Sequence, residues 1–98
     1  MKKFILKEFK YEINKFSLMV EQYVSSDFKN IVEFYICGKS IWIGEYSNYI
    51  KAEQRFLTIK NIIRNLKIKF ADLNPEEINS DKIKEISKEF LIEFRKIK

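Results

Sequence analysis

The feature that most constrains the fold is a long segment, residues 50–70, in which apolar side chains recur at steps of four and three. That spacing places them in one stripe along a helix, because a helix completes a turn in about 3.6 residues. The stripe comprises Ala52, Phe56, Ile59, Ile63, Leu66 and Phe70, with Ile62 at its margin. Ser47 or Asn48 can cap the first free amides. The pattern predicts a helix over about 48–70 that buries one face.

A second helical region follows at Asn74-Pro75-Glu76-Glu77. Asparagine at the N-cap, proline at the first helical position and glutamate at the third are start signals. Asn79-Ser80-Asp81 offers another start. We therefore predict a short helical turn at 75–79 and a main helix at about 81–97, so that helix occupies most of 75–97. The expected buried stripe of the main helix is Ile83, Ile86, Phe90, Phe94 and Ile97.

The N-terminal segment fits two templates. A helix over about 3–24 gathers Ile5, Phe9, Ile13, Phe16, Val20 and Val24 in one sector. A strand over 3–13 explains the alternation of Phe9 and Tyr11, but Lys7-Glu8 interrupts that alternation. The helix accounts for more residues, so we expect a long N-terminal helix. The alternative is a strand at 3–13 that adds to the hairpin described next.

Residues 32–46 have the pattern of an antiparallel β-hairpin, with strands at about 31–37 and 40–46. A loop of Gly38-Lys39 fits a type II′ turn, whose twist matches that of the strands. Because side chains alternate across a sheet, this register separates two faces. The core face carries Val32, Phe34, Ile36, Ile41 and Ile43, and the other face carries Glu33, Tyr35, Cys37, Ser40, Trp42, Gly44 and Tyr46.

The second face of the hairpin has two interpretations. Tyr35, Trp42, Tyr46 and Glu33 can form a partner-binding platform, because tyrosine and tryptophan dominate binding hot spots. Alternatively a helix covers this face, and the aromatic pair stabilises the hairpin. The free edges of the hairpin can also pair with a strand of a partner or of a second copy. We therefore expect a monomer or a weak homodimer through the hairpin edge.

The net charge of +5 lies in one segment of the chain. Residues 50–70 carry six Lys and Arg against Glu53 alone. Lys60, Arg64 and Lys67 follow at i, i+4 and i+7 along one flank of the predicted helix. Like charges at this spacing repel each other slightly, which favours a polyanion-binding role for these residues. The alternative is an ordinary solvated helix flank.

The composition excludes most catalytic arrangements. The chain has no histidine, one cysteine and two glycines. It therefore lacks the commonest general base, a thiolate metal cage and a glycine-rich phosphate loop. Glu8-Phe9-Lys10 imitates the Glu-x-Lys of some metal-dependent nucleases, a triplet that arises by chance in a lysine-rich chain. We expect a protein that is not an enzyme and that has no metal site and no cofactor.

A chain of 98 residues forms one domain, and the predicted elements make it an α+β domain over 1–98. A signal peptide needs an apolar run of about 7–15 residues, and the first residues have none. No run approaches the roughly 18 residues of a membrane span. We expect a cytoplasmic protein without a membrane partner.

In size and composition the chain resembles the small inhibitors that phages and mobile elements encode against bacterial defence nucleases, the anti-CRISPR proteins. It equally resembles toxin-immunity proteins. An inhibitor that imitates nucleic acid should be acidic, whereas this chain is basic. We therefore expect a non-catalytic inhibitor of a nucleic-acid-processing partner, such as a CRISPR ribonucleoprotein nuclease, with contacts to protein and to guide RNA. The alternatives are a module that binds RNA or single strands directly, and a toxin-immunity protein.

Overall fold

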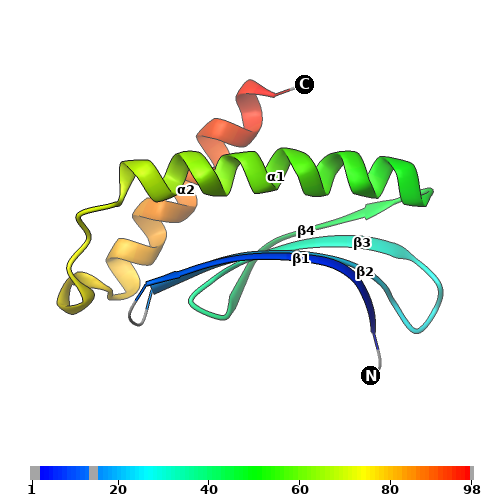
Figure 1. The fold of residues 1–98 in the computed structure, drawn as a ribbon, viewed down its shortest axis with the longest axis horizontal. Coiled ribbons are helices and arrows are strands. Elements are labelled where there is room, and N and C mark those ends of the chain that lie inside the picture. The colour runs from blue at the N-terminus through cyan, green and yellow to red at the C-terminus, as the bar shows by residue number, and fades with distance from the viewer. Residues whose placement is uncertain (1–2, 14–15, 98) are drawn as a thin grey trace.

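One antiparallel sheet and two helices form two layers in the computed structural model, which describes residues 3–13 and 16–97 (Figure 1). The strands are β1 (Phe4–Ile13), β2 (Phe16–Val24), β3 (Asn30–Ile36) and β4 (Lys39–Tyr46), and they lie side by side in chain order. The two α-helices are α1 (Tyr49–Lys69) and α2 (Ser80–Lys96), and the short 3-10 helix η1 (Pro75–Glu77) lies between them in the chain. This order of strands and then helices defines the α+β class.

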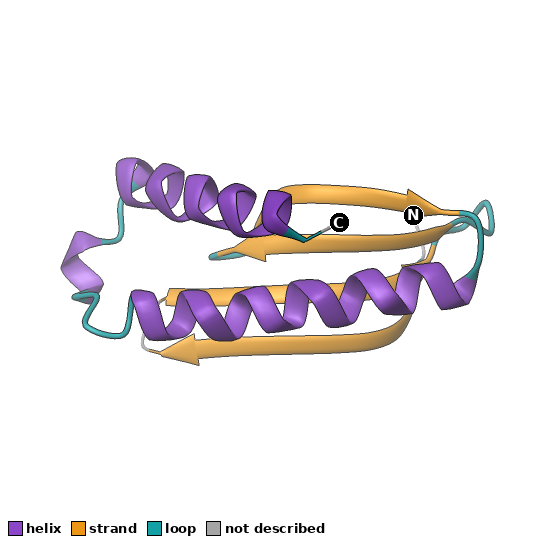
Figure 2. Ribbon diagram, turned by 90° about the horizontal axis from the view of Figure 1, so that it is seen from above, coloured by secondary structure: helices purple, strands orange, loops and turns teal. Residues whose placement is uncertain are grey.

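Both helices lie on the same face of the sheet, which we call the helix face; the opposite face is the open face (Figure 1). Seen from above, α1 follows the β1–β2 side of the sheet and α2 lies over the β3–β4 side (Figure 2). The sheet bends away from α1 towards the start of β1, so the open face is concave (Figure 1).

The expected N-terminal helix over 3–24 is wrong. Residues 4–13 and 16–24 form β1 and β2, which pair with each other as antiparallel strands. A β-bulge between Ile5 and Lys7 interrupts the alternation, and beyond it Lys7, Phe9 and Tyr11 all point to the helix face. The alternative strand at 3–13 is closer to the structure. However, β1 pairs with β2, and it is β2 that pairs with the hairpin.

The helix expected over 48–70 is confirmed as α1. Its buried side chains are Ala52, Phe56, Ile59, Ile62, Ile63 and Leu66. The side chain of Asn48 caps the helix by accepting a hydrogen bond from the backbone N–H of Lys51 at 2.9 Å. Phe70 ends the helix and is half-buried. The 3.6-residue period thus identified both the helix and the face that it buries.

The helical region expected over 75–97 is also confirmed, as η1 and α2. Asn79 caps α2 by accepting a hydrogen bond from the backbone N–H of Lys82 at 2.9 Å. Phe90 is buried and stacks on Phe34 of β3, with 4.1 Å between ring centroids and 9° between ring planes. Ile97 lies beyond the end of α2 and is exposed, so the predicted stripe ends one turn early.

The hairpin is present, but its predicted register is wrong. The turn is formed by Cys37 and Gly38, with φ of 51° and 78°, as the two central residues of a type I′ turn require. A bulge then shifts the pairing back by one residue, because Phe34 and Tyr35 pair with Trp42 and Ser40 and leave Ile41 of β4 as the extra residue. The net slip is one residue, so Trp42 lies opposite Phe34 and not opposite Tyr35.

A slip of one residue turns every side chain of a strand to the other face. Trp42 and Tyr46 of β4 therefore point to the helix face, and Ile43 points to the open face with 57% of its surface exposed. The β3 half of the expected core face is confirmed. Its residues Val32, Phe34 and Ile36 are fully buried.

Candidate interaction surfaces

The structure separates the four residues of the predicted aromatic platform. Glu33 and Tyr35 of β3 lie on the open face, whereas Trp42 and Tyr46 of β4 lie under the helices. The ring of Trp42 meets that of Phe94 at 81°, with 4.9 Å between centroids. The side chain of Trp42 therefore packs against α2, that of Tyr35 lies on the opposite face of the sheet, and the four residues do not form one platform.

Two hydrogen bonds between tyrosine and glutamate cross from β2 to β3 on the open face. The hydroxyl of Tyr23 donates to Glu33 Oε1 at 2.8 Å, and the hydroxyl of Tyr35 donates to Glu21 Oε1 at 2.7 Å. Glu21 and Glu33 lie directly opposite each other, an unfavourable pairing of like charges on its own. The ammonium of Lys3 offsets it, 2.7 Å from Glu21 Oε1. The result is a polar cluster whose two glutamates are joined by tyrosine hydroxyls and the ammonium of Lys3.

The cluster fixes the protonation of its members. Burial acts to raise the pKa of Glu33, but hydrogen bonds from Ser40, Tyr23 and Tyr35 outweigh it and hold that pKa below its usual value. Burial, and then the hydrogen-bonded carboxylates, raise the pKa of Tyr23 and of Tyr35 well above that of a free phenol. Both hydroxyls therefore remain donors near neutral pH, and Glu33 remains an ionised acceptor.

The open face is acidic. The strand registers place five glutamates on it among the described residues: Glu8, Glu12, Glu21, Glu33 and Glu45. Three lysines contact these glutamates: Lys3 pairs with Glu21, Lys10 Nζ lies 3.6 Å from Glu12 Oε2, and Lys29 Nζ lies 3.6 Å from Glu45 Oε1. The glutamates outnumber these cations, so the face stays acidic. Glu21 is only 4% exposed and belongs to the cluster, whereas Glu8, Glu12 and Glu45 are exposed to solvent. This acidic surface could not be predicted from the sequence, because the segment that forms β2 was assigned to a helix.

The three residues of the predicted basic flank lie together along α1, above β1. Lys60 Nζ lies 5.1 Å and Arg64 Cζ 5.7 Å from the ring centroid of Phe9, and Lys67 Nζ lies 5.0 Å from that of Tyr11. Within the described part of the chain, none of these three cations forms an ion pair. We call this row the cation row.

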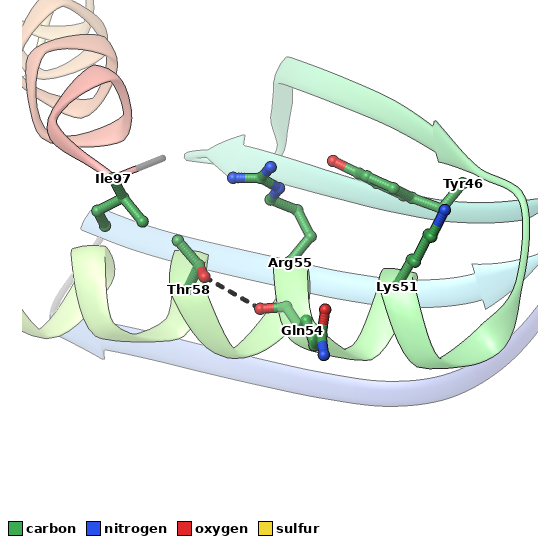
Figure 3. Close-up of a pocket in the computed structure, with 6 residues that line it drawn as sticks. All are labelled: Tyr46, Lys51, Gln54, Arg55, Thr58 and Ile97. Atoms are coloured by element: carbon green, nitrogen blue, oxygen red, sulfur yellow. Dashed lines mark hydrogen bonds between the residues drawn. The ribbon is translucent and has the colours of Figure 1, made fainter.

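A pocket of about 350 Å³ opens between α1, the end of β4 and the residue that follows α2 (Figure 3). It is lined by Tyr46, Lys51, Gln54, Arg55, Thr58 and Ile97. Arg55 Cζ lies 4.8 Å from the ring centroid of Phe94 and 6.0 Å from that of Tyr46, so two aromatic rings hold the guanidinium in place. The hydroxyl of Thr58 donates to the backbone carbonyl of Gln54. The volume is at the small end for a ligand site.

Phe28 is a feature that the sequence reasoning missed. It lies in the loop between β2 and β3 and is 84% exposed, with a φ of 64°. Its backbone N–H donates to the carbonyl of Ser25 at 2.9 Å, and Ser25 pairs with Lys29 to close the loop. Three-residue loops of this kind usually have glycine at the left-handed position. A phenylalanine there is unfavourable for the backbone and exposes its ring.

The described residues that were considered for catalysis belong to no group that could bind a metal ion. Among residues 3–13 and 16–97, no group of three histidine, cysteine, aspartate or glutamate side chains could hold a metal ion. Glu8 and Lys10 of the Glu-x-Lys triplet are exposed on the open face, where Glu8 lies opposite Glu21. Cys37 is half-buried and packs against the core.

The chain matches no protein-family model, no curated protein and no solved structure. No described helix combines the length and the apolarity that crossing a membrane requires.

Proposed function

We propose that this protein is a non-catalytic inhibitor that binds a nucleic-acid-processing enzyme and covers a cationic surface of that enzyme with its open face. The observation that carries the proposal is the acidic, tyrosine-bearing open face, which lies on the side of the sheet opposite to both described helices. Enzymes that process nucleic acids present cationic surfaces to the phosphate backbone. A concave face that carries exposed glutamates complements such a surface.

The distribution of charge supports this choice more than the net charge does. The positive excess of the chain lies on α1, on the other side of the sheet from the open face. Complementarity at an interface depends on the charges that face the partner. The net charge led to an expectation of contact with guide RNA or with an acidic protein, and the acidic open face favours a cationic protein surface instead.

The buried cluster supplies rigidity to this face. Tyr23, Tyr35, Glu21 and Glu33 are held by mutual hydrogen bonds, so little side-chain entropy is lost when a partner binds. The exposed side chain of Ile43 adds an apolar contact beside them. An interface with fixed tyrosines and an apolar contact is typical of protein recognition.

The same face disfavours direct RNA binding, because its glutamates repel phosphates. An RNA-binding module would have to use the cation row. Inhibition of a CRISPR nuclease and immunity to a nuclease toxin are both compatible with the proposal, since each requires a cationic site to be covered.

The test compares two variants of equal charge change. Glu8, Glu12 and Glu45 are replaced by glutamine in the first, and Asp72, Glu76 and Glu77 by the corresponding amides in the second, which serves as the control. Tagged proteins capture partners from the native host, each captured enzyme is purified, and its cleavage of nucleic acid is measured with each protein added. We expect inhibition by wild type and by the control, and inhibition at least tenfold weaker, about 1.4 kcal/mol, by the open-face variant.

Two results would contradict the proposal. One is capture that disappears after RNase treatment and persists in the open-face variant, which would indicate RNA binding. The other is cleavage of RNA or DNA by the purified protein with magnesium or manganese that is abolished by Glu8→Ala, which would indicate an enzyme.

A further inference from the structure

The outer edge of β1 is free. β1 is the first strand of the sheet order, so its outer backbone groups have no neighbouring strand in the described part of the chain. It is ten residues long and contains no proline. Proteins usually protect such edges by shortening them, by placing proline or lysine in them, or with a β-bulge. β1 has a bulge between Ile5 and Lys7, but beyond it the strand pairs regularly with β2 from Lys7 to Ile13. This regular stretch is the kind of edge to which extended peptides add.

The cation row lies directly above this edge. Phe9 and Tyr11 point from β1 to the helix face. The cations of Lys60, Arg64 and Lys67 lie over their rings. Arg64 and Lys67 are exposed and Lys60 is half-buried. The three charges therefore lie over the second half of β1, around Phe9 and Tyr11, on its helix-facing side, and solvent reaches them.

The spacing of these charges suits a strand. With a rise of about 1.5 Å per helical residue, Lys60 and Arg64 are separated by about 6 Å along the helix axis, and Arg64 and Lys67 by about 4.5 Å. Side chains on one face of a strand repeat every 6.8 Å or so. The whole row is about 10.5 Å long on the helix axis, so a strand added to β1 would place two successive side chains of one face beneath it.

We propose that the edge of β1 binds an extended segment of a partner protein with Asp or Glu at alternate positions. The backbone of the segment extends the sheet by one strand, and its carboxylates pair with Lys60, Arg64 and Lys67. This site is separate from the open face and goes beyond the function proposed above.

Charge argues against the other occupants. A second copy of this chain, paired through β1 about a two-fold axis, would bring two cation rows against each other. A nucleic acid can neutralise the row, but it has no backbone amides and carbonyls to pair with the edge in strand register. An acidic extended peptide satisfies both the charges and the edge.

The test uses a short synthetic peptide that alternates glutamate and valine, titrated into the full chain and followed by amide chemical shifts. We expect shifts centred on β1 and slower hydrogen exchange of its outer amides. The same peptide with alternate amides N-methylated keeps the charge but loses the hydrogen bonds, and a peptide that alternates lysine and valine reverses the charge. Neither should bind.

Two protein variants complete the test. Replacing Lys60, Arg64 and Lys67 by glutamate should lower the affinity for the acidic peptide at least tenfold. The control variant has glutamate in place of Lys39, Lys84 and Lys88, which are also exposed. It changes the net charge by the same amount and should have little effect on the affinity for the acidic peptide. If the first variant unfolds, glutamine at the same three positions replaces it, with the same expectation.

Several outcomes would overturn the proposal. They are equal binding of the N-methylated peptide, no binding of the acidic peptide, or an equal loss of affinity in both variants. Tighter binding of a single-stranded RNA without slower exchange in β1 would assign the cation row to nucleic acid. Loss of inhibition in the open-face variant with peptide binding intact would show that the two sites are independent.

Discussion

The indole of Trp42 meets the ring of Phe94 edge to face, with 4.9 Å between the ring centroids. This contact joins β4 to α2, beside the stacked pair of Phe34 and Phe90. Gly44 leaves room for the indole, because a Cβ atom at that position would lie only 2.5 Å from the Trp42 ring. Trp42 is therefore part of the interface that holds α2 on the sheet.

Trp42→Ala should consequently lower the free energy of unfolding by about 3 kcal/mol, because it leaves a cavity beside Phe94. Urea denaturation followed by circular dichroism measures the change. Ile43→Ala is the matched control, since the neighbouring side chain is exposed on the open face; it should cost less than about 1 kcal/mol. Equally small losses in both variants would contradict the register of β4.

The helices could be predicted from the sequence because their signals are local. The apolar steps of α1 and the asparagine caps at Asn48 and Asn79 each depend on residues within one or two turns. The strands were harder to predict. The bulge between Ile5 and Lys7 breaks the two-residue period that identifies a strand, and the remaining pattern of 3–24 then fits a helix better.

The open face was predicted only in part for a related reason. Glu33 and Tyr35 were correctly placed away from the core, because β3 alternates without interruption. Trp42 and Tyr46 were not, since a cysteine at positive φ in the turn carries no sequence signal and the following bulge adds a second shift. The partners of Glu33 and Tyr35 come from β2 and needed the strand pairing.

Phe28→Gly should stabilise the protein, by about 0.5–1 kcal/mol. A left-handed φ costs a residue with a Cβ atom about 1–2 kcal/mol, and the flexibility of glycine in the unfolded chain offsets part of the gain. Thermal unfolding measures the difference. Phe28→Ala keeps the Cβ atom and should show no such gain, which separates the backbone effect from the loss of the exposed ring. A less stable glycine variant would mean that the ring contributes to the fold.

Glu33 should make part of the stability depend on pH. Its pKa is lower in the folded protein than the ordinary value of 4.5, so the unfolded chain binds more protons in the acidic range. The contribution of Glu33 is complete above about pH 4.5 and is lost as the pH falls through its lowered folded pKa. Melting temperatures measured from pH 3 to pH 6 should drop more steeply for wild type than for Glu33→Gln. Glu12→Gln, an exposed glutamate on the same face, is the control, and a Glu33→Gln curve parallel to wild type would refute the prediction.

Gln22→Met should raise the free energy of unfolding by about 1 kcal/mol. Gln22 is fully buried on the helix face of β2, opposite Lys7 and Val32. Neither atom of its side-chain amide has a hydrogen-bond partner among the described residues, and an unpaired buried polar group costs about 1–3 kcal/mol. Methionine has a similar shape and needs no partner. Chemical denaturation should show the gain, while Gln54→Met on the exposed side of α1 should change stability by less than about 0.5 kcal/mol. A loss of stability in Gln22→Met would show that the amide is hydrogen-bonded in solution, and the core would then depend on a polar contact beneath α1.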